Sequence, residues 1–181
     1  MIYHDDILDK RFSDELYSDL LKCPWYADNI ANRHTFPYGE KGTHLLLGTT
    51  ILNLTYPIFK KDVEENIVKK FLGLFEHLCQ RFNKRLRLKA IDANLQFKGL
   101  DGSFHVDGAD NEEAFILLLC NEILDKESGG QFINETQDSI VDFKHGRIIE
   151  FKASDSHKGL AFNTPYVPRI SVKFYAQNLD G

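Results

Sequence analysis

Just past its middle, the chain reads Gly102-Ser103-Phe104-His105-Val106-Asp107. His105 and Asp107 are two residues apart, and side chains at that spacing point to the same face of a β-strand. An imidazole and a carboxylate on one face can bind a single metal ion from one side. A similar run occurs at His4-Asp5-Asp6, but it lies in a charged terminus where no strand is predicted. The later pair is therefore the candidate metal site.

A third ligand would complete such a site, and two downstream histidines are candidates. His157 follows residues 147–151, which have the apolar pattern of a strand. Together with His105 and Asp107 it would form the two-histidine, one-carboxylate facial triad of non-haem iron oxygenases, which leaves coordination positions open. The alternative, His145, lies in a predicted turn, where a histidine is usually solvated. The sequence favours His157.

Residues 168–177 alternate between polar and apolar side chains. On a strand, one face would carry Arg169, Ser171 and Lys173, and the other would carry Ile170, Val172 and Phe174. The apolar face suits a core. The polar face suits a barrel interior that binds an anion, because Arg169 offers a planar fork to a carboxylate and Ser171 adds a hydroxyl donor.

Helical periodicity is confined to the first 85 residues. Ser13 is the predicted N-cap of a short helix, and residues 62–84 have the apolar spacing of an amphipathic helix. Residues 26–44 are predicted as a loop, which with Trp25 could form a substrate lid or a plain surface connection. Strands are predicted near 86–98, 103–107, 114–121, 130–135, 138–144, 146–152 and 168–177. The expected fold is mostly β, a jelly roll over residues 86–177, with residues 1–85 as helical and loop support packed on one sheet.

From about Ala90 to Gln177 the chain resembles the iron(II)- and 2-oxoglutarate-dependent oxygenases, in particular their prolyl-4-hydroxylase-like branch. The matching pieces follow the family's order: Asn94-Leu95-Gln96, residues 102–107, Phe115 to Leu119, Gly129-Gly130-Gln131-Phe132, Gly146 to Phe151, His157 with Gly159, and Arg169-x-Ser171. Two pieces depart from the family pattern. Gln131 stands where the family usually has Glu, and Arg169 stands where collagen-type prolyl hydroxylases usually have Lys.

The resemblance implies a double-stranded β-helix and a set of site residues. The implied Fe(II) ligands are His105, Asp107 and His157. The implied residues for 2-oxoglutarate are Arg169 and Ser171 at its far carboxylate, with Asn94 and Gln96 facing the cofactor or forming a polar sheet face. The implied reaction uses O2 and 2-oxoglutarate, with ascorbate as a candidate reductant, to hydroxylate a C–H bond, foremost of a peptidyl proline. Asp107 favours hydroxylation, because related radical halogenases lack that carboxylate.

Other functions are compatible with the same residues. The substrate of such an oxygenase could instead be a free amino acid, a small metabolite or an alkylated base. A cupin-like metal protein with isomerase, lyase or ligand-binding function would keep the metal site without needing Arg169 and Ser171. A catalytically silent ligand-binding jelly roll would need no metal.

The composition limits the setting in which the chain works. It has 181 residues, 43% hydrophobic and 27% charged, which predicts one soluble globular domain. Its net charge of −5 argues against a nucleic-acid partner. Cys23, Cys79 and Cys120 form no CxxC pair, so we expect no disulfide framework and a cytoplasmic location. No signal peptide or membrane span is predicted. The expected partner is a peptide, protein or small-molecule substrate, and the sequence leaves the oligomeric state open.

Overall fold

The computed structural model describes residues 1–30, 45–55, 63–122 and 127–180. Its elements, in chain order, are β1 (Ile2–His4), α1 (Lys10–Leu21), β2 (Tyr26–Ile30), β3 (Leu45–Asn53), α2 (Glu65–Arg81), β4 (Leu86–Gln96), β5 (Glu112–Leu119), β6 (Phe132–Asn134), β7 (Ser139–Val141), β8 (Ile148–Lys152), β9 (His157–Gly159) and β10 (Arg169–Asn178). No helix in these ranges is long and apolar enough to cross a membrane.

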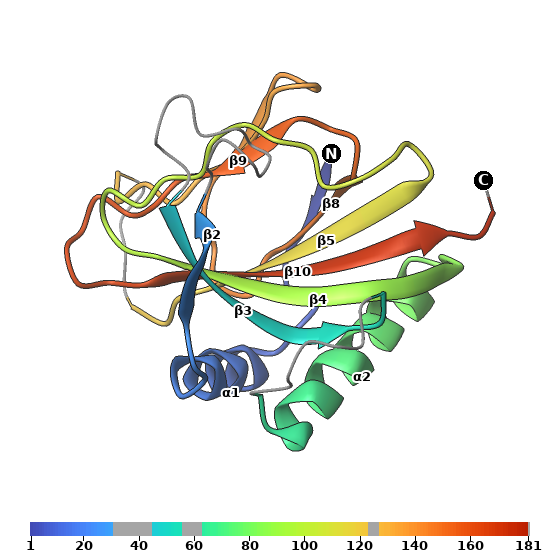
Figure 1. Ribbon diagram of the computed structural model, residues 1–181, viewed down its shortest axis with the longest axis horizontal. Helices are drawn as coiled ribbons and strands as arrows, with labels where there is room; N and C mark the ends of the chain where they lie inside the picture. The colour runs from blue at the N-terminus through green and yellow to red at the C-terminus, as the bar shows by residue number, and fades with distance from the viewer. Residues whose placement is uncertain (31–44, 56–62, 123–126, 181) are drawn as a thin grey trace.

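The strands form two antiparallel sheets. The larger has seven strands in the order β1-β8-β5-β10-β4-β3-β2, and the smaller has three in the order β7-β6-β9. The smaller sheet lies over one face of the larger, and both helices lie against the opposite face (Figure 1). This is a double-stranded β-helix with helices packed on one sheet, as predicted from the sequence.

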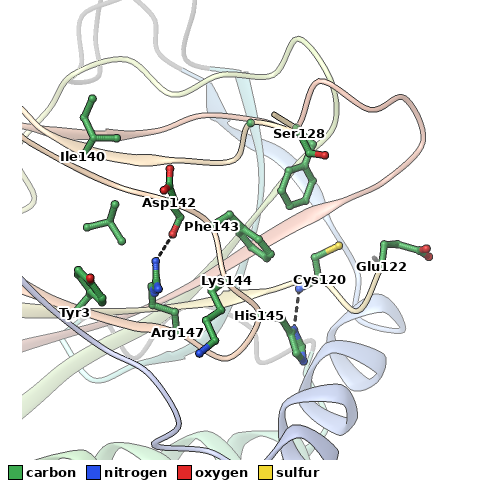
Figure 2. Close-up of a pocket in the computed structure, with 13 residues that line it drawn as sticks. Tyr3, Cys120, Glu122, Ser128, Ile140, Asp142, Phe143, Lys144, His145 and Arg147 are labelled. Carbon is green, nitrogen blue, oxygen red and sulfur yellow. Dashed lines mark hydrogen bonds between the residues drawn. The ribbon is translucent and has the colours of Figure 1, made fainter. Parts of the chain in front are cut away.

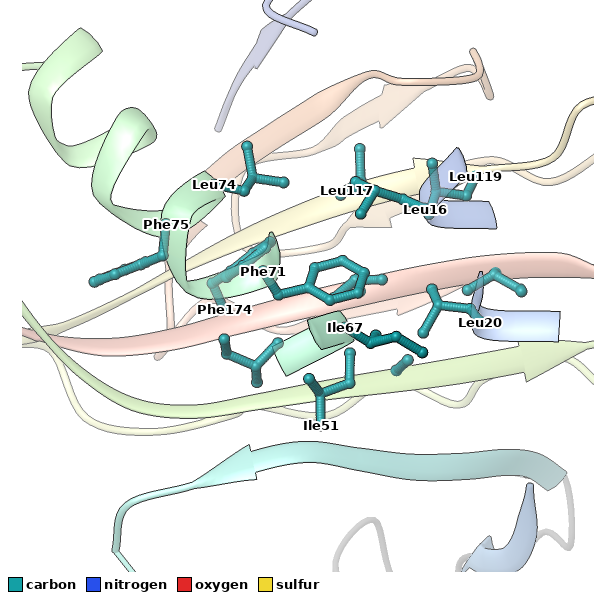
Figure 3. Close-up of a cluster of buried hydrophobic side chains, with 14 of the residues drawn as sticks. Leu16, Leu20, Ile51, Ile67, Phe71, Leu74, Phe75, Leu117, Leu119 and Phe174 are labelled. Atoms are coloured by element: carbon teal, nitrogen blue, oxygen red, sulfur yellow. The ribbon is translucent and has the colours of Figure 1, made fainter. Parts of the chain in front are cut away.

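The main core lies between the larger sheet and the two helices. Figure 3 shows side chains of α1 and α2 meeting those of β3, β5 and β10. The apolar face of β10 is fully buried there, and the ring of Phe174 lies 6.2 Å from those of Phe71 and Phe75. Burying each such ring stabilises the fold by roughly 1.5–3 kcal/mol. This packing fixes which face of β10 is left to point between the two sheets.

The N-terminal part of the chain differs from its prediction as helical and loop support. It supplies β1, β2 and β3 to the larger sheet. Residues 26–30 are β2 rather than loop, and the rest of the predicted lid, residues 31–44, lies outside the described residues. The helix α1 begins before Ser13, because the side chain of Asp9 caps it by accepting a hydrogen bond from the Phe12 amide. Ser13 is a buried helical residue and not the N-cap.

Two predictions about the His-x-Asp run at residues 105–107 and the similar run at residues 4–6 were also wrong. Residues 103–107 do not form a strand; an isolated β-bridge joins His105 to His157, and the Asp107 amide donates to the Ala153 carbonyl. The N-terminal segment, where no strand was expected, forms β1 and pairs with β8. His4 ends that strand and stacks on Phe82, with ring centroids 4.1 Å apart. His4 therefore has a structural role at the edge of the larger sheet.

Candidate metal centre and anion pocket

The backbone brings His105, Asp107 and His157 together from separate parts of the chain. His105 and His157 exchange amide-to-carbonyl hydrogen bonds of 3.1 and 2.9 Å across their bridge, and the Asp107 amide donates to the Ala153 carbonyl at 2.8 Å. The three side chains each offer one ligand atom within 4.8 Å of the others. His157 Nε2 is 3.4 Å from Asp107 Oδ2, and His105 Nε2 is 3.7 Å from Asp107 Oδ1.

Hydrogen bonds set the orientation of both imidazole rings. Nδ1 of His105 lies 2.9 Å from the Ser103 carbonyl, and Nδ1 of His157 lies 2.8 Å from the Asp155 carbonyl. A carbonyl oxygen only accepts, so Nδ1 must carry the proton in each ring. Nε2 therefore carries the lone pair in each ring, on the side that faces Asp107, which is the arrangement that metal-binding histidines use.

Asp107 is buried and one of its oxygens is unsatisfied. Its side chain is 5% exposed, and Oδ1 accepts a 2.7 Å hydrogen bond from Nζ of Lys173. Among the described residues, none gives Oδ2 a hydrogen bond. Burial opposes ionisation of Asp107, but the positive charge of Lys173 is the largest of the effects that counter burial, and the pKa of Asp107 is lowered. A buried, ionised oxygen facing two imidazole lone pairs fits a divalent transition metal.

Aromatic rings seat His157 on its other sides. The ring of Phe132 stacks on it with centroids 5.3 Å apart, and Phe151 meets it edge-on at 4.6 Å. Asp155, whose backbone carbonyl lies behind His157, is itself held in place. Its side chain accepts a 3.0 Å hydrogen bond from the fully buried Asn134. Such support fixes a ligand ring and keeps water away from it.

A buried arginine lies in the same cavity. Arg169 is 1% exposed, its Nε donates to the Gly130 carbonyl at 3.0 Å, and its Nη1 donates to Gln96 Oε1 at 2.6 Å. Nη2 is buried and has no hydrogen-bond partner within the described chain. Burial lowers the pKa of Arg169 to about 10. An unpaired guanidinium is costly to bury, so this donor fits an anionic group of a ligand.

The absence of a side chain at Gly159 leaves space for the Arg169 guanidinium. A Cβ at Gly159 would lie 3.2 and 3.3 Å from Nη1 and Nη2 of Arg169. Those distances are tighter than most real Cβ contacts, so a side chain there would crowd the guanidinium. The resemblance matched Gly159 without giving it a role, and the close approach of the Arg169 guanidinium to its backbone supplies one.

All seven site residues inferred from the sequence line one cavity with a volume of about 40 Å³. Register explains their convergence, because Arg169 is opposite Gln96 and Ser171 is opposite Asn94 on the antiparallel pair of β10 and β4. Residues directly opposite each other present their side chains on the same face. The cavity is closed on the smaller-sheet side by Phe132, His157 and Gly159.

Two residues of this cavity make contacts that the sequence did not indicate. Lys173 was placed on the polar face of the last strand, but nothing in the pattern indicated its contact with Asp107. Gln96 was a candidate cofactor contact, whereas its amide holds Arg169 and itself donates to the carbonyls of Leu100 and Gly159 at 2.9 and 3.1 Å. The register of β10 with β4, which sets Arg169 opposite Gln96, would have suggested the second contact.

His145, the alternative ligand, lies elsewhere. It lines a separate pocket with a volume of about 540 Å³ between the β5 end and the β7–β8 turn, shown in Figure 2. Its Nδ1 accepts a 3.1 Å bond from the Cys120 amide, and its Nε2 is 3.1 Å from Asp14. Burial lowers the pKa of His145. The expectation that this turn histidine is solvated was wrong, but it shares no cavity with His105, Asp107 or His157.

Comparison with known proteins supports the fold. No protein-family model and no curated protein sequence matches the chain. Among solved structures, a 2OG-Fe(II) oxygenase family oxidoreductase from Burkholderia pseudomallei is similar, with 14% identity over 97% of this chain and 84% of that chain and a TM-score of 0.67. A prolyl hydroxylase from Trichoplax adhaerens, in complex with a hypoxia inducible factor peptide fragment, has 13% identity over 99% and 84% with a TM-score of 0.68.

A third similar structure is HygX from Streptomyces hygroscopicus, with nickel, 2-oxoglutarate and hygromycin B bound. It has 11% identity over 98% of this chain and 82% of that chain, with a TM-score of 0.66. The chain therefore has the fold of the 2-oxoglutarate/iron(II) oxygenases, and the resemblance inferred from its motifs is confirmed at the level of the fold. Prolyl hydroxylases are among the proteins that share it.

Proposed function

We propose that this protein is an iron(II)- and 2-oxoglutarate-dependent dioxygenase that hydroxylates a C–H bond. One observation carries the proposal: a single cavity holds two buried, unsatisfied polar atoms, Asp107 Oδ2 beside two imidazole Nε2 atoms and Arg169 Nη2. The first suits a divalent metal and the second suits a carboxylate. A cupin-like metal protein would need only the first. The fold shared with 2-oxoglutarate oxygenases supports the same assignment.

In the proposed mechanism, each residue has a defined task. His105, Asp107 and His157 would hold Fe(II), which together with 2-oxoglutarate supplies the oxidising chemistry for O2-dependent hydroxylation and releases succinate and carbon dioxide. Arg169 would bind the far carboxylate of 2-oxoglutarate through Nη2, with the Ser171 hydroxyl beside it. The departure of Arg169 from the lysine of collagen-type enzymes keeps the positive charge and adds a planar fork.

The residues around these groups position them and exclude water. Gln96 accepts the hydrogen bond of Arg169 Nη1, while Nη2 has no partner among the described residues. Phe132 and Phe151 seat His157. The presence of Asp107 as a third protein ligand favours hydroxylation over halogenation, because halide would take its position.

The substrate follows as a finer proposal. The prolyl-4-hydroxylase-like motifs favour a peptidyl proline, and a peptide-bound prolyl hydroxylase is among the similar structures. HygX, with hygromycin B bound, shares the fold equally well, which supports a small-molecule substrate as the alternative. We also propose a cytoplasmic location, which the free thiols of Cys23, Cys79 and Cys120 support.

The test of the proposed function needs no knowledge of the substrate. Purified protein with fresh Fe(II), ascorbate and 2-oxoglutarate should form succinate slowly under air. Proline peptides and small molecules can then be screened for an increase of 16 mass units, the mass of one inserted oxygen atom. An iron-loaded protein that forms no succinate in either assay would favour a cupin-like metal protein.

A further inference from the structure

The polar face of the larger sheet continues past the anion pocket. Cross-strand register sets Lys173 opposite Asp92, and Asp92 opposite Thr50, so that these three residues form one row across β10, β4 and β3. Directly opposed residues place their side chains on the same face. Ser171 and Asn94 form the neighbouring row, between this one and Arg169. The Lys173 row is therefore on the far side of the site from the proposed 2-oxoglutarate carboxylate.

A second hollow lies over this row. Its volume is about 240 Å³, and it shares Asn94 and Lys173 with the metal cavity. The residues that line it are Gly48, Thr49, Thr50, Asp92, Ala93, Asn94 and Lys173. None of these carries an aromatic or large aliphatic side chain. A proline ring would find little apolar surface here, whereas a polar molecule would find charged and hydrogen-bonding groups.

Lys173 is the residue that links the hollow to the metal site. Its side chain is 23% exposed, and its Nζ donates to Asp107 Oδ1 at 2.7 Å. A divalent cation on Asp107 would compete for the charge that holds Lys173 and would repel its ammonium group. Within the described chain, the ammonium would then keep only Asp92, opposite it on β4, as a nearby carboxylate, and a ligand carboxylate in the hollow could pair with it in place of Asp107.

Asp92 gives the same row an acceptor of opposite charge. It accepts a 3.0 Å hydrogen bond from the Thr50 hydroxyl, and it lies across the strand pair from Lys173, where Cβ atoms are about 5 Å apart. One row thus presents a cation and an anion within the reach of a single small molecule. An amino-acid head group carries the two complementary charges on groups attached to one carbon atom.

We propose that this hollow is the substrate subsite and that it binds a free amino acid or a similar small zwitterion. Lys173 binds the carboxylate and Asp92 binds the ammonium group, which leaves the side chain of the ligand to be hydroxylated. The proposal rests on the proposed oxygenase function and replaces peptidyl proline as its substrate, because both termini of the bound residue must be free.

The experiment measures binding and requires no turnover. Protein loaded with Mn(II) and 2-oxoglutarate, without oxygen, is titrated in a calorimeter with the twenty free amino acids. The best ligand is compared with its amide and its N-acetyl derivative, and with an end-capped proline peptide. We expect at least one amino acid to bind with a Kd of about 1 mM or tighter. Neutralising either end should weaken binding at least about tenfold.

Variants assign each end to its residue. The Lys173→Met variant should bind the amino acid no more tightly than its amide. The Asp92→Asn variant should bind the amino acid no more tightly than its N-acetyl derivative. Lys89→Met is the matched control, because Lys89 is also paired with a carboxylate, is 27% exposed and lies outside both hollows. It should bind like the wild type. Thermal unfolding of each variant checks that it is folded.

Failure of this proposal can be told apart from failure of the proposed function. If 2-oxoglutarate binds but no free amino acid does, or if only the proline peptide binds after it, the assignment of the hollow as an amino-acid subsite is wrong. The oxygenase proposal then still stands. Equal binding of the acid, the amide and the N-acetyl form to the wild type would also overturn the subsite, without any variant. If 2-oxoglutarate does not bind to the metal-loaded protein, the oxygenase proposal fails, and the subsite fails with it.

Discussion

Replacing Arg169 with alanine tests whether the anion pocket binds 2-oxoglutarate. In the wild type the guanidinium is 1% exposed and has one donor, Nη2, without a partner among the described residues. A ligand carboxylate there would form a desolvated charge pair, and losing such a pair costs about 2–5 kcal/mol. The affinity for 2-oxoglutarate should therefore fall roughly 30-fold to several thousand-fold, while metal binding is retained because Arg169 does not contact the triad.

The structure also predicts a loss of stability in the same variant. Alanine leaves the Gly130 carbonyl and Gln96 Oε1 without the donors they have now. Each buried acceptor left unsatisfied costs about 1–3 kcal/mol, so the variant should unfold at a lower temperature. Arg169→Lys keeps the charge without the fork, and it should retain part of the affinity.

The assay is titration of 2-oxoglutarate into the iron-loaded protein without oxygen. The matched control is Arg147→Ala. Arg147 is also largely buried, with 11% exposure, and binds Asp5 through two nitrogens at 2.7 and 2.9 Å, but it lies outside the metal cavity. It should keep the wild-type affinity. If a folded Arg169→Ala protein binds 2-oxoglutarate within threefold of wild type, the anion pocket is misassigned.

Three further predictions concern other groups. The protein should bind one Fe(II) per chain, and Asp107→Ala or His157→Ala should remove it; unchanged metal content by elemental analysis in both variants would contradict the triad. Gly159→Ala should weaken the binding of 2-oxoglutarate in the same titration and leave the iron content unchanged, because the added Cβ would lie 3.2 Å from Nη1 of Arg169. An unchanged affinity would show that the guanidinium has room to move. The Arg147 hydrogen bond is the largest of the causes that lower the pKa of Asp5, so its stabilising effect is present above the unfolded pKa of about 3.9 and is lost as the pH falls through the folded value. Asp5→Asn should therefore lower the melting temperature at pH 7, and this deficit should shrink as the pH falls below the unfolded pKa; a deficit that does not shrink with falling pH would rule out this linkage.

The site residues could be predicted from the sequence because their signals are local or short. Arg169 and Ser171 share a strand face by their spacing alone, and His105 and Asp107 stand two residues apart. His157 was chosen over His145 because it follows the apolar strand pattern of residues 147–151 and because His145 was expected to be a solvated turn residue. The second reason was wrong, since His145 is half-buried, but the position of His157 after a strand did not depend on it.

The N-terminal strands could not be predicted in this way. Residues 45–53 form a long strand, but Gly48 and a register shift between Thr50 and Leu52 break the alternation that would reveal it. The strand β1 has only three residues and is stabilised by pairing with β8, at the other end of the sequence. A strand of three residues is too short to show alternation, so its pairing with a distant segment cannot be read from its own sequence.

The sequence by itself determined the jelly-roll class, the four-residue set of His105, Asp107, His157 and Arg169, and the apolar face of β10, because periodicity and residue chemistry act over a few positions. Only the tertiary structure decided what each side chain contacts. The bond from Lys173 to Asp107, the hold of Gln96 on Arg169 and the two unsatisfied atoms all depend on how β4, β10 and the segment before β5 fold over one another. Such contacts join residues far apart in the chain, and their distances are fixed by strand register and by packing against the core.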